Sequence, residues 1–296
     1  MRKERKHIIL PFLLPAALLY LAFFIYPTVR ALYVSLYDWS GFTPTWTFVG
    51  LDNFRELLND QTYRNALTFT LILMVVGGIL VFGIAFLFTS LLSSGMRGKK
   101  FFRAVLFFPN VVATVALATL WAFIYNYNFG LLNGFFKMVG LTQLGRTTWT
   151  GPNTIVWAVL VALVWMYVGF YVVLLLAGVD KISPELFDAA KVEGANQAQM
   201  FLRITVPLLW DVLTVAVILW GIGAIKQFEF MYAFAGIRPP RDIWTVAVYM
   251  YILAFGKRDA VFRMGYGTAV AVTLLILVII FAVIARRLMR REAIEY

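Results

Sequence analysis

The stretch SPELFDAAKVEGANQAQMFLRITVP, residues Ser183 to Pro207, is the long polar segment that separates two long apolar runs. Ser183 followed by Pro184 predicts the N-cap and the first residue of a helix. Glu185 and Asp188 then place negative charge in or near the first turn, where the helix dipole favours it. We therefore expect a helix to begin at Pro184.

The second half of this stretch predicts a second helix. Gly194 can end the first helix, and Asn196 can cap another that carries Phe201 and Ile204. Pro207 stands near the start of the next apolar run. Because a few turn residues would suffice to join two membrane spans, this helix-turn-helix is best explained as a docking element for a soluble partner.

The spacing of the motif resembles that of a known family. Asp188-Ala189-Ala190, Glu193-Gly194-Ala195, Ile204 and Pro207 are similar to the cytoplasmic "EAA" loop of the membrane subunits of bacterial ABC importers. Asp188 stands where that family usually has Glu, and Glu193 stands where Asp is common; both exchanges keep the charge. The alternative is an ordinary amphipathic loop helix. The resemblance implies that the following residues couple the chain to an ATP-binding subunit: Glu185, Asp188, Ala189, Ala190, Glu193, Gly194, Phe201, Ile204 and Pro207.

Composition points to a membrane protein. The 296-residue chain is 62% hydrophobic, and its mean hydropathy is +0.82. The absence of cysteine excludes disulfides, thiolate metal sites and cysteine nucleophiles. The single histidine, His7, lies in a basic flank, so no metal site is expected. The net charge of +11 does not indicate nucleic-acid binding, because Lys and Arg stand mostly beside apolar runs, as membrane topology requires.

Apolar runs of sufficient length predict six membrane-spanning helices. They cover approximately residues 8–26, 67–92, 101–125, 154–179, 206–225 and 267–285. We expect an all-α polytopic protein with a single transmembrane domain over residues 1–296. Pro27 marks the outer end of the first span or a kink, and Pro109-Asn110 interrupts the third span. A short surface helix is expected at Val49–Leu58, whose sequence VGLDNFRELL also resembles a landmark of the sugar-importer branch.

Charge distribution predicts the orientation. The N-terminal segment, the loop after the second span, the loop of residues 183–207 with its flanks, and the C-terminal segment are all basic, which places them in the cytoplasm by the positive-inside rule. Residues 226–266 are expected outside although they carry five Lys or Arg beyond Lys226. Ile243–Phe255 is apolar but too short to span, and is interpreted as a packed external or re-entrant helix.

Polar and aromatic residues within the spans indicate a transport path. Aromatic rings stack on sugar rings and amides bond hydroxyls, so this mixture suits a carbohydrate. The alternative for each residue is helix packing or an interfacial belt. Lys226 and Glu229 flank the last of these positions, and their roles stay open. The candidate substrate-path residues are Asn110, Thr114, Trp165, Tyr167, Trp220 and Gln227.

The resemblance implies a type I ABC importer permease of the carbohydrate-uptake branch in the bacterial cytoplasmic (inner) membrane. Its expected partners are a second permease in a heterodimer, two ATP-binding subunits, an external solute-binding protein, a sugar substrate and membrane lipid. The sequence has no phosphate-binding Gly-x-x-x-x-Gly-Lys-Ser/Thr motif, so ATP and Mg²⁺ are expected on the partner ATPase and no cofactor on this chain. The chain is therefore expected to be a transport subunit, not an enzyme. A phosphorylated glycerol or polyol is an alternative substrate, and a stand-alone secondary transporter is the competing class.

Overall fold

The computed structural model describes residues 4–93, 96–234, 240–255 and 262–290. The chain divides into two compact units. Unit 1 comprises Met1–Tyr63 and Tyr249–Ile276, and unit 2 comprises Arg64–Val248 and Leu277–Tyr296. Three helices, α4, α15 and α16, run across the boundaries between them.

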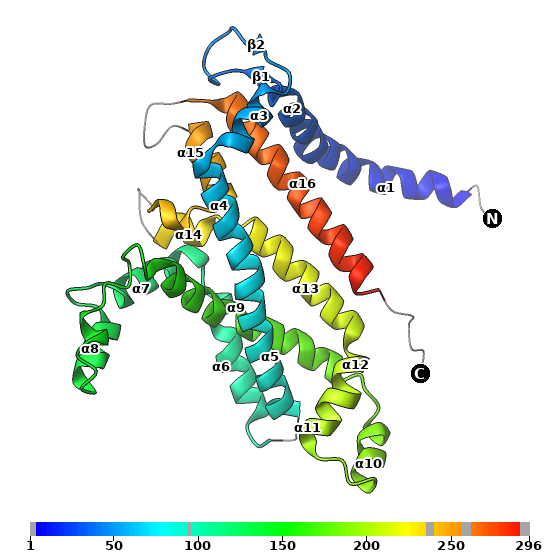
Figure 1. Cartoon of the computed structure of the whole chain (residues 1–296). Helices are drawn as coiled ribbons and strands as arrows, with labels where there is room; N and C mark the ends of the chain where they lie inside the picture. Colours follow the sequence, from blue (N-terminus) through cyan, green and yellow to red (C-terminus); the bar gives the residue numbers. More distant parts are fainter. Residues whose placement is uncertain (1–3, 94–95, 235–239, 256–261, 291–296) are drawn as a thin grey trace. The chain divides into compact units, whose positions relative to one another are not determined.

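Helices dominate the described part of the chain (Figure 1). In order, the elements are α1 (Glu4–Tyr20), η1 (Leu21–Ile25), α2 (Tyr26–Val34), β1 (Tyr37–Asp38), β2 (Thr47–Phe48), α3 (Asp52–Asn59), α4 (Gln61–Ile72), η2 (Leu73–Gly77), α5 (Gly78–Ser93), α6 (Lys99–Val111), α7 (Thr114–Ile124), α8 (Leu131–Met138), η3 (Leu144–Arg146), α9 (Ile155–Val179), α10 (Pro184–Val192), α11 (Gln197–Met200), η4 (Phe201–Thr205), α12 (Val206–Leu208), α13 (Trp210–Ile225), α14 (Glu229–Phe234), η5 (Arg241–Ile243), α15 (Val246–Phe255) and α16 (Met264–Leu288).

The first apolar helix is longer than the sequence predicted. It continues without a break past Tyr26 to Val34, so Pro27 is not its outer end. The π turn η1 directly precedes the proline, and the Tyr26 N–H donates to the Leu21 carbonyl five residues back. Because proline has no N–H to donate, this one-residue shift accommodates it inside the helix.

Unit 1 also contains a short hairpin, which the all-α expectation did not include. β1 pairs antiparallel with β2, with Tyr37 opposite Phe48 and Asp38 opposite Thr47. Aromatic side chains favour such pairing. The predicted surface helix is confirmed as α3, and its Asn53 amide donates to the carbonyls of Ser35 (2.8 Å) and Tyr37 (3.0 Å).

Asp60 joins several elements of unit 1. Its Oδ1 accepts from the backbone N–H groups of Thr62 (2.8 Å) and Tyr63 (3.3 Å) at the start of α4. Its Oδ2 accepts from the Tyr266 hydroxyl at 2.8 Å and from the Tyr249 hydroxyl. Burial raises the pKa of this carboxyl, but the four hydrogen bonds outweigh burial and leave the pKa below its ordinary value.

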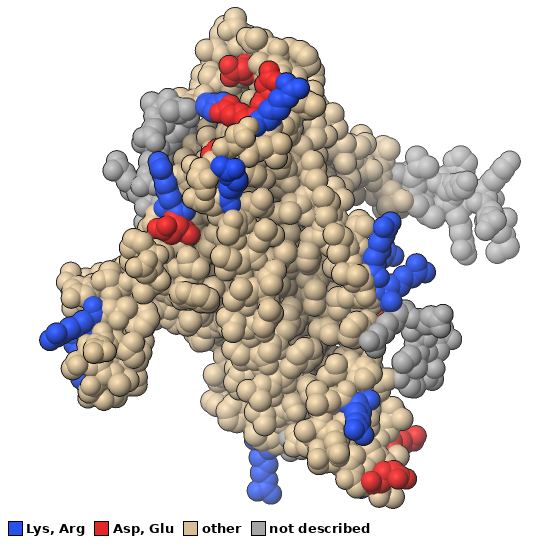
Figure 2. All heavy atoms as spheres, viewed as in Figure 1, with Lys and Arg blue, Asp and Glu red and all other residues tan. Residues whose placement is uncertain are grey.

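In unit 2, α9 is the central helix, and its bounds match the predicted span of residues 154–179. Most of its side chains are buried against neighbours that include α5 and α6. A Cβ on Gly169 would lie 1.8 Å from the Leu106 carbonyl oxygen, so the α6 and α9 backbones touch there. On the face shown in Figure 2, the middle of α5 presents no Lys, Arg, Asp or Glu.

Two predicted spans are bent. Among the described residues, four helices are long and apolar enough to cross a membrane, and six spans result if each bent pair is counted as one. α6 and α7 meet at 96°, and the break falls at Val112-Ala113, where the backbone is extended. Pro109 lies inside α6, so the predicted interruption at Pro109-Asn110 is wrong by about one turn.

The fifth predicted span, residues 206–225, is bent near its start, at Leu209. Gln197–Leu208 and Trp210–Ile225 meet at 73°. Pro207 lies inside the first of these helices, after the π turn η4.

The apolar segment predicted at Ile243–Phe255 forms η5 and α15 and is packed: Ile243 and Val248 are fully buried. Whether α15 is external or re-entrant stays a prediction.

Candidate functional site

We use the name docking segment for residues 183–207. Its first helix is α10, which begins after Ser183 as the sequence predicted and ends at Val192, with Glu193 as the C-cap. Gly194 has φ +77°, the left-handed conformation expected there. The Ala195 N–H donates to the Ala190 carbonyl (2.9 Å) and the Gly194 N–H to the Lys191 carbonyl (3.0 Å). These two bonds form a Schellman motif, so the turn geometry favours glycine at this position.

The second helix of the docking segment starts with a reciprocal cap. The Gln199 N–H donates to Asn196 Oδ1 at 2.9 Å, and the Asn196 N–H donates to Gln199 Oε1 at 2.8 Å. This confirms Asn196 as the cap. The helix carries Phe201 and Ile204 and continues to Leu208 instead of stopping before the membrane run.

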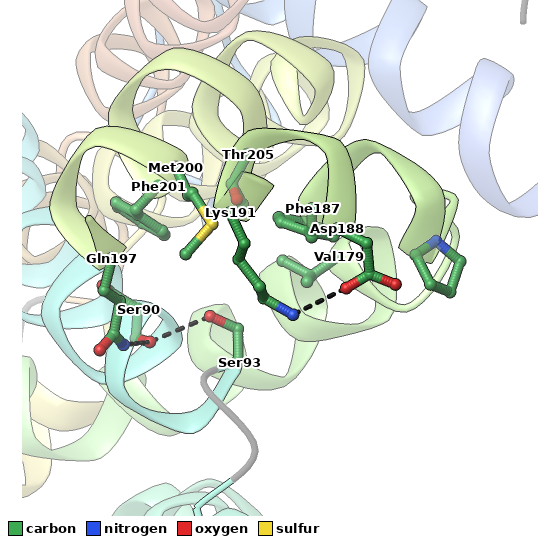
Figure 3. A pocket seen from close by; sticks show the side chains of 11 residues that line it. Ser90, Ser93, Val179, Phe187, Asp188, Lys191, Gln197, Met200, Phe201 and Thr205 are labelled. Carbon is green, nitrogen blue, oxygen red and sulfur yellow. Dashed lines mark hydrogen bonds and ion pairs between the residues drawn. The ribbon is translucent and has the colours of Figure 1, made fainter. Parts of the chain in front are cut away.

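A cavity of about 420 Å³ lies between α10 and residues of α5, α9, α11 and η4 (Figure 3). At its edge, the Gln197 amide donates to the Ser90 carbonyl near the end of α5 (3.1 Å), which ties α11 to α5. Asp188 is paired with Lys191 of its own helix at 2.8 Å, and both side chains are mostly exposed. None of the α10 residues is buried, so the helix packs only loosely on its neighbours.

The predicted coupling residues divide into an exposed set and a packed set. Six are on or directly after α10, and the last three follow on the second helix. Phe201 is buried and meets Phe86 edge-on at a centroid distance of 6.2 Å. The exposed or half-exposed members are Glu185, Asp188, Ala189, Ala190, Glu193 and Gly194. Ile204 and Pro207 are partly buried. The free surface is therefore that of α10.

A cluster of opposite charges precedes the docking segment. Asp180, the residue after α9, accepts from Lys99 Nζ at 3.2 Å and from Arg103 at 3.3 Å, both on α6. Burial raises the pKa of the Asp180 carboxyl, but the two cations outweigh it and lower the pKa below its usual value. Sequence analysis missed this cluster because its members are about 80 residues apart, and no short motif links them.

Four of the six candidate substrate-path residues lie together. Asn110 from α6, Tyr167 from α9, Trp220 from α13 and Gln227 after α13 line one cavity of about 270 Å³. Tyr171, one turn after Tyr167, also lines it and was missed. Its spacing of four residues from Tyr167 was the available signal.

The other two candidates lie elsewhere. Trp165 borders a different, largely apolar cavity of about 480 Å³ beside α5 and α6, with 42% of its surface exposed. Its ring meets Trp121 edge-on at 5.6 Å. Thr114 is the first residue of α7 and lines neither cavity. The 96° bend after Val111 explains this, because it removes Thr114 from the helix face that carries Asn110.

Trp220 is a packing residue as well as a lining residue. It is 6% exposed, and its Nε1–H donates to the Met74 carbonyl in the π turn η2 at 2.8 Å. A Cβ on Gly77 or Gly78 would lie within 3 Å of its ring, so these glycines make its space. Its edge contacts Tyr167 at 5.7 Å. Trp220 therefore fixes the cavity wall.

Gln227 supplies the cavity with unused hydrogen-bonding capacity. Its Nε2 is buried without a partner in the described part of the chain, and its Oε1 receives only a long 3.5 Å bond from the Tyr167 hydroxyl. A buried amide N–H without a partner is costly, so such a group fits a ligand that brings an acceptor.

Lys226 and Glu229, on either side of Gln227 in the sequence, are exposed and form no ion pair within the described residues. No group of three acidic or His residues that could hold a metal occurs among the residues described.

Comparisons with known proteins agree with this architecture. Residues 82–293 match the family of binding-protein-dependent transport system inner membrane components. The chain is 32% identical to the diacetylchitobiose uptake system permease protein NgcF of Streptomyces coelicolor, over 94% of this chain and 81% of that protein. It is 30% identical to the trehalose/maltose transport system permease protein MalF of Thermococcus litoralis, over 92% of this chain and 90% of the relative.

Solved structures show the same fold. A chain of a bacterial ABC transporter involved in the import of the acidic polysaccharide alginate superposes with a TM-score of 0.84, at 21% identity, over 98% of this chain and 97% of that one. A chain of a bacterial alginate ABC transporter in complex with alginate pentasaccharide-bound periplasmic protein gives a TM-score of 0.82 at 21% identity, over 97% of this chain and 96% of that one. The predicted helical permease fold is thereby confirmed.

Proposed function

Because the chain belongs to the family of inner-membrane components of binding-protein-dependent transport systems, we propose that it is the permease subunit of an ATP-driven ABC importer of a sugar or related polyol. The observation that carries the substrate class is the unpaired amide nitrogen of Gln227, in a cavity lined by Tyr167 and Trp220. Aromatic edges and an amide donor suit a hydroxylated ring. The named uptake systems of the relatives, for diacetylchitobiose and for trehalose and maltose, support the same class.

The docking segment is the proposed contact with a separate ATP-binding subunit that carries ATP and Mg²⁺. The exposed face of α10 supports this role, because it presents Glu185, Asp188 and Glu193 with the apolar Val192, which is 88% exposed. Closure of two such subunits would move two docking segments and alternate access to the cavity between two permeases. The proposed complete assembly contains a second permease, two ATP-binding subunits and an external solute-binding protein.

The proposed orientation places both termini and the docking segment in the cytoplasm of a bacterial cell. The absence of cysteine permits a direct test, because single cysteines can be introduced without a background signal. A cysteine at Gln197 should resist an impermeant thiol reagent added outside cells, whereas one at Thr45 should react. Labelling of the Gln197 position from outside would refute the cytoplasmic docking segment.

The substrate cavity is tested by uptake of labelled disaccharides into cells. Gln227→Ala removes the unpaired amide and should raise the half-saturating concentration about tenfold, as expected for losing ~1.4 kcal/mol of hydrogen bonding. Assembly should stay normal. Gln143→Ala is the matched control, since that amide is exposed outside the cavity. If Trp165→Ala abolishes uptake while Gln227→Ala does not, the path follows the apolar cavity instead.

A further inference from the structure

The segment that joins the bent third span to α9 forms a small folded element of its own. We use the name α8 element for residues 126–153, which contain α8 and η3. In Figure 1, α8 lies apart from α5, α6 and α9. One side of α8 is packed, and the other side is open.

The packed side is centred on Asn133, which is 2% exposed. Its Oδ1 accepts from Trp149 Nε1 at 2.6 Å, and its Nδ2 donates to the Thr147 carbonyl at 3.2 Å. The ring of Phe136 lies 5.9 Å from that of Trp149. These contacts fix the rotation of α8 about its axis, so they also determine which residues form its opposite face.

The opposite face is apolar. Leu131, Phe135 and Met138 are four and three residues apart, so they share one side of the helix. They are 73%, 53% and 79% exposed. Further exposed apolar side chains precede and follow the helix in sequence: Phe129, Val139, Leu141 and Leu144. A soluble segment would not leave so large an apolar stripe in water.

The charges of the α8 element have one sign. Residues 126–153 contain Lys137 and Arg146 and no Asp or Glu. Both cations are exposed, and neither forms an ion pair with any residue that the structure describes. Figure 2 shows Lys and Arg over this element without acidic neighbours. Cations beside an apolar stripe complement an anionic phospholipid surface.

Both ends of the element are tied to membrane helices. α7 ends at Ile124 and α9 begins at Ile155, and α9 is a candidate span. The apolar stripe is therefore continuous in sequence with helices that are apolar enough to cross a membrane. We propose that the α8 element lies in the lipid interface as an amphipathic membrane-surface helix, with Leu131, Phe135 and Met138 in the acyl region and Lys137 and Arg146 at lipid phosphates.

The test uses the cysteine-free background. A nitroxide label is attached to Phe135→Cys, Met138→Cys or the control Gln143→Cys in the full chain, reconstituted in vesicles of phosphatidylethanolamine and phosphatidylglycerol. Collisions with oxygen report lipid, and collisions with a water-soluble nickel chelate report water. The ratio of oxygen to nickel collisions should be several-fold higher at positions 135 and 138 than at position 143, which is exposed in the same element.

Each other outcome overturns the proposal. High nickel accessibility at position 135 means that the stripe faces water, and low accessibility to both reagents means that protein covers it. Protection that appears only when a solute-binding protein is added would identify a protein docking site. When phosphatidylcholine replaces phosphatidylglycerol, the ratio at position 138 should fall; an unchanged ratio would refute the role of Lys137 and Arg146.

Discussion

The turn at Gly194 gives a graded test of coupling. Its φ of +77° is left-handed, and a Cβ placed there would meet no atom within 4 Å. Substitution therefore costs backbone strain alone, without steric exclusion inside the chain. That strain is about 1 kcal/mol for alanine and larger for a β-branched residue, whereas asparagine tolerates this conformation. A cost of ~1 kcal/mol lowers the population of the native turn relative to alternatives about fivefold.

Coupling should be strongest in the wild-type protein, which has Gly194. It should then weaken in the order Gly194→Asn, Gly194→Ala and Gly194→Val. The assay is retention of the ATP-binding subunit by detergent-solubilised permease, with sugar uptake measured in the same cells. Gly194→Val should insert normally, because the turn lies outside the spans, and should lose both retention and uptake. Gly194→Leu, which adds bulk at the proposed contact, should behave at least as badly.

Gly140 provides a matched control. It has φ +83°, and a Cβ there also meets no atom within 4 Å, but it lies in the α8 element. Gly140→Val thus introduces comparable strain away from the docking segment and should retain the ATP-binding subunit. Full retention and full uptake by Gly194→Val would show that the docking segment does not couple. Equal loss in Gly140→Val would assign the effect to general instability.

Two further substitutions test the packing that shapes the cavity. Gly169→Ala places a Cβ 1.8 Å from the Leu106 carbonyl oxygen; separation of the two helices should cost roughly 1–3 kcal/mol or more and lower the melting temperature in detergent, whereas Gly83→Ala, with nothing within 4 Å, should not. Trp220→Phe removes the donor to the Met74 carbonyl, so it should cost ~1–3 kcal/mol of stability, and an unchanged melting temperature would show that the carbonyl finds another partner.

Local chemistry allowed the docking segment to be predicted almost in full. Ser183, Gly194 and Asn196 each occupy the position that their conformational preferences indicate, and the helix bounds follow from them. These signals lie within a few residues of the structure they specify. The 25-residue helix α9 was equally predictable, because an unbroken apolar run has few alternatives in a membrane.

The bends were not predictable from composition. Residues 101–125 are apolar on both sides of Val112, so hydropathy cannot distinguish one straight span from two helices at 96°. The break was predicted at Pro109, but a helix can retain a proline and break one turn later, as happens here. This error also misplaced Thr114 in the candidate cavity, and it shows that face arguments hold only within one straight helix.

Pro207, like Pro109, lies inside a helix that bends only after the proline, and its position bears on the mechanism. Because the π turn η4 absorbs the proline, the helix that starts at Gln197 reaches Leu208 without interruption. Only the 73° bend at Leu209 separates it from α13, which carries Trp220 and leads to Gln227. On the other side, Asp180 connects the start of the docking segment to α6, which carries Asn110. We infer that a displacement of the docking segment would reach two walls of the cavity by separate routes, through α13 and through α6. A substitution that loosens one route should therefore weaken coupling without abolishing it.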